Sequence, residues 1–159
     1  FQIDRWGKLT KAFRVVAFVL RFLHNTRCNQ SNKLSGHLKS EELKNAKLCI
    51  FKESQEQASP NEISLLQHKK EIPTKSNIYR FNPFIDEDGL LRVRTRLSEA
   101  ALTYAETNPI LLPNDHLSKL LTSHQHLFLN HAGVSTLLCS LRDEYWVLGL
   151  RNIAKTVVY

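Results

Sequence analysis

The N-terminal part of the chain places apolar residues at helical spacing. In residues 5–27 they recur every three or four positions, at Trp6, Leu9, Phe13, Val16, Leu20 and Leu23. Basic residues fill much of the remaining surface, at Arg5, Lys8, Lys11, Arg14 and Arg21. An apolar side opposite a charged side is typical of a helix that packs on a core. We therefore predict a helix over residues 5–27.

Two further helices are predicted before residue 75. Ser40 is a favourable N-cap, and the Glu41-Glu42 pair suits the first turn of a helix that extends to Gln57. Pro60 is well placed at the first position of the next helix, which ends at Pro73. Residues 1–75 are expected to form a helical linker region.

The pattern becomes β-like between residues 76 and 113. Residues 85–93 are typical of a strand, an Asp-Gly turn and a second strand, and residues 108–113 add a short strand between prolines. The Asp86-Glu87-Asp88 run offers carboxylates for a divalent ion, but its position before Gly89 fits a turn better. We predict a small antiparallel β-hairpin element over residues 76–113.

From residue 114 onward the helical period returns. The first helix should bury one face, formed by Leu117, Leu120, Leu121, His124 and either Leu127 or Phe128. Gly133 breaks it, and the next helix should carry Leu137, Leu138, Leu141, Tyr145 and Trp146. A third helix begins near Leu150. The predicted fold class is mainly α with a small antiparallel β element (α+β), ending in a three-helix unit over residues 114–159.

Composition places the chain among folded proteins and locates its charge. Hydrophobic content is 42% and charged content 23%, both ordinary for a globular protein. The net charge of +7 comes mostly from residues 1–38, which hold seven Lys/Arg and one Asp. Such a basic face can hold phosphates by charge alone, although a solvated helix face is the simpler interpretation.

The cysteines and the longest apolar run indicate an intracellular protein without a membrane span or a secretory signal. Cys28, Cys49 and Cys139 form no CxxC pair, which favours a reducing intracellular environment and buried thiols. The run Val15–Leu20 is too short for a membrane span, which needs about 20 apolar residues, or for a secretory signal. We expect no membrane partner. Because the chain lacks Met and keeps its apolar period up to Tyr159, we interpret it as an internal piece of a longer polypeptide.

Three histidines near the C-terminus are the strongest candidates for chemistry. His126 and His131 have a spacing at which two imidazoles can bind one zinc ion, with Gly133 allowing the backbone to turn. His124 should point away from His126 on a helix. Solvated surface histidines are the alternative, and Cys139 is a possible third ligand, although a buried core thiol is favoured. No nucleophile lies in a recognisable catalytic motif, so no catalytic residue is predicted.

Several ordered motifs resemble one family. Residues 82–93, Arg96-Leu97 and residues 108–113 are similar to the segment before the integrase in polyproteins of Pao/BEL-type LTR retrotransposons. Residues 126–133, Leu141-Arg142 and residues 145–149 resemble the first half of the integrase zinc-binding domain of that family. Residues 6–9 and 14–22 look like the linker that follows its RNase H region.

The resemblance implies a His-His-Cys-Cys zinc site in a helical domain ahead of the integrase catalytic core. His126 and His131 match the two histidine ligands, and the cysteine ligands are expected beyond Tyr159. The chain would then be a non-catalytic polyprotein fragment that supports DNA integration by positioning DNA or assembling integrase. DNA and the integrase core or other polyprotein regions would be its partners, with no small-molecule substrate. Cytoplasm and nucleus would be its location in the intact element.

Two other functions are open from the residues themselves. The first is a metal-free helical module that binds nucleic acid or protein, with residues 5–27 as its basic helix. The second, ranked last, is an enzyme that uses the histidine cluster.

Overall fold

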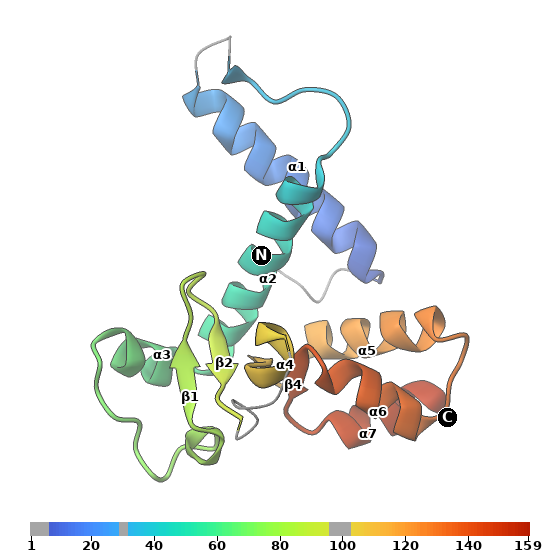
Figure 1. Cartoon of the computed structure of the whole chain (residues 1–159). Coiled ribbons are helices and arrows are strands. Elements are labelled where there is room, and N and C mark those ends of the chain that lie inside the picture. Colours follow the sequence, from blue (N-terminus) through green and yellow to red (C-terminus); the bar gives the residue numbers. More distant parts are fainter. Residues whose placement is uncertain (1–6, 29–31, 96–102) are drawn as a thin grey trace.

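The computed structural model describes residues 7–28, 32–95 and 103–159 (Figure 1). Arg5, Trp6 and the Arg96-Leu97 motif lie outside them. The elements in chain order are α1 (Leu9–Arg27), α2 (Ser40–Ala58), α3 (Pro60–Gln67), the 3₁₀ helix η3 (Tyr79–Phe81), β1 (Pro83–Ile85), β2 (Leu91–Val93), α4 (Tyr104–Thr107), β3 (Ile110–Leu112), α5 (His116–Phe128), α6 (Val134–Arg142), β4 (Tyr145–Val147) and α7 (Leu150–Val158). Long helices accompany one small sheet, which confirms the predicted α+β class.

Helices α1 and α2 pack against each other as a long pair that projects from the rest of the protein (Figure 1). Ala12 and Ala17 of α1 and Ala46 of α2 are buried and belong to one hydrophobic core. The N-terminal part of α1 also contacts α5, and α2 continues toward the sheet. No helix within the described ranges combines the length and hydropathy needed to cross a lipid bilayer.

A partly buried ion pair joins α1 to the start of α2. Arg21 donates through Nε and Nη2 to the two carboxylate oxygens of Glu42, each at 2.6 Å. It also donates to the carbonyls of Gly36 and His37. The Arg21 guanidinium and the Lys39 backbone N–H lower the pKa of Glu42 to about 2. Arg21 therefore does not belong to the exposed basic face assigned to it from the sequence.

The sheet has the strand order β1-β2-β3-β4. β1 pairs with β2 and β2 with β3 in antiparallel fashion, as predicted, whereas β3 and β4 run parallel. The prediction that Tyr145 and Trp146 continue the second C-terminal helix is wrong. Helix α6 stops at Arg142, and the aromatic and β-branched residues that follow form β4 along the edge that β3 leaves open.

The acidic run before Gly89 forms the hairpin turn between β1 and β2. Asp86 Oδ1 accepts the backbone N–H of Leu90 at 2.8 Å, and its Oδ2 pairs with Arg92. Gly89 has a φ of 76°, which a residue with a side chain rarely adopts. The oxygens of Asp86 are engaged in the turn, in agreement with the turn interpretation.

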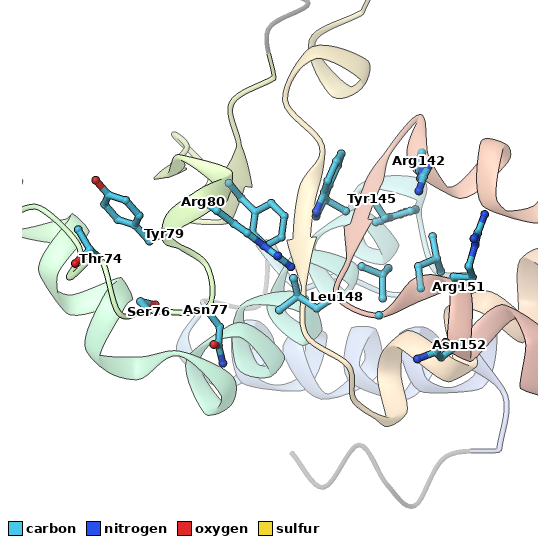
Figure 2. A pocket seen from close by; sticks show the side chains of 15 residues that line it. Thr74, Ser76, Asn77, Tyr79, Arg80, Arg142, Tyr145, Leu148, Arg151 and Asn152 are labelled. Carbon is cyan, nitrogen blue, oxygen red and sulfur yellow. The ribbon is translucent and has the colours of Figure 1, made fainter.

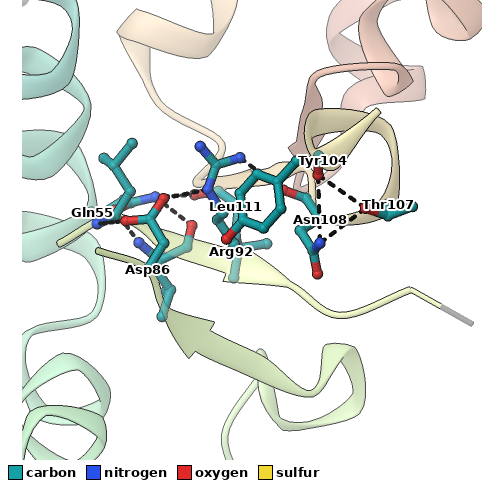
Figure 3. Close-up of polar contacts among 9 residues, drawn as sticks. Gln55, Asp86, Arg92, Tyr104, Thr107, Asn108 and Leu111 are labelled. Carbon is teal, nitrogen blue, oxygen red and sulfur yellow. Dashed lines mark hydrogen bonds and ion pairs between the residues drawn. The ribbon is translucent and has the colours of Figure 1, made fainter. Parts of the chain in front are cut away.

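One buried side chain joins α2 to the middle of the sheet (Figure 3). Gln55 Nε2 donates to the carbonyls of Leu91 at 2.9 Å and Leu111 at 2.7 Å. Its Oε1 accepts the Leu91 N–H at 2.9 Å. Gln55 thereby satisfies backbone groups of β2 and β3 where these strands share a single register pair. Arg92 extends the network to the Asn108 carbonyl.

A hydrophobic core connects the sheet with helices from both ends of the chain. It includes Phe51 of α2, Leu112 of β3, Leu117 of α5, Leu137 of α6 and Ile153 of α7. Helices α5, α6 and α7 contact one another and form the C-terminal helical part of the fold. The division into residues 1–75, 76–113 and 114–159 stays a prediction.

Candidate metal site

Helix α5 ends at a tight reversal of the backbone. Leu129 is its C-cap, and the next two residues, Asn130 and His131, have left-handed φ angles of 50° and 62°. The Asn130 N–H donates to the Leu127 carbonyl at 3.1 Å, and the His131 N–H donates to the His126 carbonyl at 3.0 Å. Both bonds satisfy carbonyls that the helix end leaves open. The reversal returns the chain to the last turn of α5.

This reversal brings the rings of His126 and His131 together. Nε2 of His126 lies 3.1 Å from Nδ1 of His131, and the ring planes are inclined by 79°. The His126 side chain is buried at the helix end, while His131 is exposed. Two neutral imidazoles in this arrangement share one hydrogen bond, with one nitrogen donating and the other accepting.

The separation of these nitrogens fits two ligands of one tetrahedral zinc ion. With Zn–N bonds of about 2.0–2.1 Å, a tetrahedral angle holds two ligand nitrogens about 3.3 Å apart. The observed 3.1 Å is close to that value. His126 and His131, the pair selected from their spacing in the sequence, therefore lie close enough for both rings to reach one metal ion.

The second nitrogen of the His126 ring is unsatisfied. Its Nδ1 is buried and has no hydrogen-bond partner among the described residues. A buried polar group without a partner costs about 1–3 kcal/mol, and such groups are uncommon in folded proteins. Metal-bound imidazoles usually donate their other N–H to a carbonyl, a carboxylate or water. Within the described residues, the Nδ1 atom of His126 therefore lacks the hydrogen-bond partner that a buried ring nitrogen needs.

No third ligand joins the pair in the part of the chain that the structure describes, which contains no cluster of three or more His, Cys, Asp or Glu. His124 is exposed on α5. Cys139 is exposed on α6, so its predicted burial is wrong. Helix α6 turns Leu138 and Leu141 toward the core, which leaves the position between them on the outer side. Among the described residues, the candidate site therefore consists of two side chains, His126 in the last turn of α5 and His131 in the α5–α6 connection.

The buried face of α5 differs in part from the predicted one. Leu117 and Leu121 are buried as expected. The predicted continuation of this face is wrong, because His124 is exposed and the side chains of Leu127 and Phe128 are 61% and 72% exposed. The helix thus leaves two large apolar side chains in solvent beside the histidine pair.

A polar stripe lies on the buried side of α5 instead, formed by Ser118, Thr122 and His126 at four-residue spacing. The Ser118 hydroxyl donates to the Pro113 carbonyl, and the Thr122 hydroxyl donates to the Ser118 carbonyl at 2.7 Å. These short local bonds let both hydroxyls enter the core without an unsatisfied group. The stripe leads along the helix to His126.

Gly133 does not make the turn that the sequence assigned to it. Its φ is −65°, and a Cβ built on it would meet no atom within 4 Å. The left-handed residues are Asn130 and His131. Asn adopts this conformation more readily than most residues, so Asn130 was the available sequence signal for the reversal.

The sequence did not reveal a cavity that three arginines line. Arg80, Arg142 and Arg151 line one cavity of about 770 Å³ between the segment before β1 and the start of α7. The three residues come from different elements, and no local pattern relates them. The parallel strand β4 lies between Arg142 and Arg151 in the chain, and both of these arginines line the same cavity as Arg80.

Comparison with known proteins gives no match. No family model matches the chain, and neither a curated protein nor a solved structure is significantly similar to it.

Proposed function

We propose that residues 114–159 form the histidine half of a structural zinc-binding domain. On this proposal, the chain is a non-catalytic piece of a Pao/BEL-type retrotransposon polyprotein that supports DNA integration. The observation that carries the zinc assignment is the 3.1 Å approach of the His126 and His131 ring nitrogens. The family assignment depends on the order of the sequence motifs along the chain.

The position of the pair supports a structural role for the metal. His126 is in the last turn of α5, and His131 is the second left-handed residue of the reversal that leads into α6. A zinc ion bound there would fix the angle between these two short helices. A small helical unit gains much of its folding free energy from such an ion. In the family that the sequence resembles, two thiolates supply the remaining ligands.

The proposed partners follow from the same family. DNA and the integrase core, or other polyprotein regions, would contact this piece in the cytoplasm and nucleus. Catalysis would belong to the integrase core, and the piece itself would not be an enzyme. Its contribution would be to position DNA or to assemble integrase.

Thermal unfolding with and without zinc tests the proposal. A ligand that binds only the native state raises its melting temperature. Because the cysteine ligands are expected beyond Tyr159, the unaltered chain should bind zinc weakly. Excess zinc should stabilise the unaltered chain and the His124→Ala variant to a small, equal extent, but not His131→Ala. His131 and His124 are both exposed, so neither change should prevent folding. Equal stabilisation of all three proteins by zinc would contradict the assignment of His131.

The sequence of the parent polypeptide is an independent test of the family. A cysteine pair shortly after Tyr159, followed by a carboxylate-bearing core, is expected. Its absence would favour the alternative, a metal-free module that binds nucleic acid or protein. One observation supports that alternative, since Lys11, Arg14 and Arg27 are exposed on α1.

A further inference from the structure

A cavity of about 770 Å³ lies between the η3 region and the β4–α7 connection (Figure 2). This volume is in the range of about 300–1,000 Å³ that is usual for small-molecule and nucleotide sites. Its lining is mixed, with the aromatic rings of Phe81 and Trp146 beside polar side chains such as Asn77 and Asn152. It does not include His126 or His131, so it is separate from the candidate metal site.

The charge of this cavity is positive and uncompensated. Arg80, Arg142 and Arg151 line it, and no carboxylate side chain does. All three arginines are exposed, and none forms an ion pair within residues 7–28, 32–95 and 103–159. Three like charges at one concave surface repel one another, and a bound anion would remove that repulsion.

One of the arginines is held in place by aromatic contacts. The Arg80 guanidinium lies 4.7 Å from the centre of the Phe81 ring, and Phe81 packs against Trp146 with ring centres 5.6 Å apart. Figure 2 shows the Arg80 side chain reaching toward Leu148, while Arg142 and Arg151 stand on the opposite side of the cavity. A guanidinium oriented by stacking loses less entropy when it binds a phosphate.

The position of Arg151 is unfavourable for the helix itself. It lies in the first turn of α7, which has no acidic residue and no side-chain N-cap. A cation at a helix N-terminus opposes the helix dipole, whereas an anion there is stabilised. The local preference for an anion therefore agrees with the charge of the three arginines, although the helix end alone would not define a site.

We propose that this cavity binds a nucleotide unit of a single-stranded nucleic acid, with the arginines on its phosphates and a base near Phe81 and Trp146. Guanidinium groups bind phosphate oxygens in pairs. Phe81 and Trp146 are half-buried and line the cavity with part of their surface, and aromatic surface of this kind accepts unstacked bases. This inference deepens the proposed role in DNA integration and rests on it for the choice of nucleic acid as the phosphate source. It does not require zinc.

The test measures binding of a fluorescent oligo(dT) to the whole chain by anisotropy. The triple variant Arg80→Gln, Arg142→Gln, Arg151→Gln should bind at least about tenfold more weakly. The matched control, Lys11→Gln, Arg14→Gln, Arg27→Gln, removes the same charge from exposed positions of α1. It should weaken binding by less than about threefold. An equal loss in both variants, or a loss in the control alone, would overturn the proposal.

Competition and salt dependence distinguish the possible ligands. Oligo(dT) should compete better than thymidine monophosphate, and the monophosphate better than inorganic phosphate. The slope of log K against log salt should become less steep by about 2 in the cavity variant, at about 0.7 for each lost phosphate contact. Polyglutamate that binds as tightly with the same arginine dependence would instead identify an acidic-peptide site. If duplex DNA bound more tightly than oligo(dT), the proposed contact of an unstacked base with Phe81 and Trp146 would be rejected.

Folding and zinc are followed in parallel. Arg151→Gln should not lower the melting temperature, because the charge opposes the helix dipole. If His131→Ala removes stabilisation by zinc and leaves oligonucleotide binding intact, both proposals hold. Zinc stabilisation without oligonucleotide binding would reject the cavity alone, whereas arginine-dependent binding without zinc stabilisation would reject the metal site alone.

Discussion

Nε2 of His126 lies 3.1 Å from Nδ1 of His131, although the two residues are five positions apart in the sequence. On an uninterrupted helix such residues point about 140° apart around the axis. Their approach therefore requires the helix to end between them. The left-handed Asn130 and His131 provide this end, and the His131 N–H bond to the His126 carbonyl secures it.

The reversal after α5 should tolerate a side chain at Gly133. Gly133→Ala is expected to change the free energy of unfolding by less than about 1 kcal/mol, because its φ is negative and its Cβ position is open. Urea unfolding measures this. Gly89→Ala, at a φ of 76° in the β1–β2 turn, is the contrasting change and should destabilise the protein by about 1 kcal/mol or more. If Gly133→Ala destabilised the protein more than Gly89→Ala, the assignment of the reversal after α5 to Asn130 and His131 would be contradicted.

The observed orientation of α5 predicts unequal costs for two truncations on this helix. Leu121→Ala should lower the free energy of unfolding by about 2–4 kcal/mol, because it leaves a cavity in the core. Phe128→Ala removes a larger side chain that is 72% exposed and should cost less than about 1 kcal/mol. Chemical denaturation of both variants provides the comparison, and similar losses would indicate a different orientation of α5.

The buried amide of Gln55 should be essential to the sheet. Gln55→Leu leaves the Leu91 N–H and the Leu91 and Leu111 carbonyls without partners, at a cost of roughly 3 kcal/mol or more. Gln57→Leu is the matched control on the same helix, since Gln57 is exposed and its side chain donates to Glu53 at the protein surface. Its expected effect is below about 0.5 kcal/mol. Equal effects on the denaturation midpoint would rule out the bridging role of Gln55.

The Arg21–Glu42 pair should make the α1–α2 contact sensitive to acid. The pKa of Glu42 is lowered from 4.5 to about 2 by the Arg21 and Lys39 bonds. Its stabilisation is therefore complete above pH 4.5 and is lost as the pH falls toward 2. Denaturation of the unaltered chain and of Glu42→Gln should differ most near neutral pH and converge in that acidic range. A constant difference from pH 7 to 2 would contradict this prediction.

Periodicity in the sequence predicted most of the fold. The α1, α2 and α3 helices, the hairpin around Gly89 and the short strand after Pro109 follow from apolar spacing, capping residues and turn chemistry, which act locally. The fourth strand could not be found in this way. Tyr145–Val147 follows a helical segment directly, and its strand conformation depends on pairing with β3, which is distant in the sequence.

The sequence predicted one of the two candidate sites and not the other. The spacing of His126 and His131 sufficed to name the pair, because both flank one helix end. Burial on α5 was harder to predict, since Ser118 and Thr122 enter the core only by bonding to nearby carbonyls. The arginine cavity is assembled from η3, α6 and α7, so no sequence window contains it.

The proposed function requires His126 and His131 to bind one metal ion together. Histidine ring NMR during zinc titration tests it most directly, with the exposed His124 as an internal reference. The ring signals of His126 and His131 should shift together along one binding curve as excess zinc is added, while the signal of His124 should not change. In His131→Ala, the zinc affinity obtained from the His126 signal should fall by about tenfold or more. Independent titration of the two rings, or an equal response from His124, would contradict the shared site.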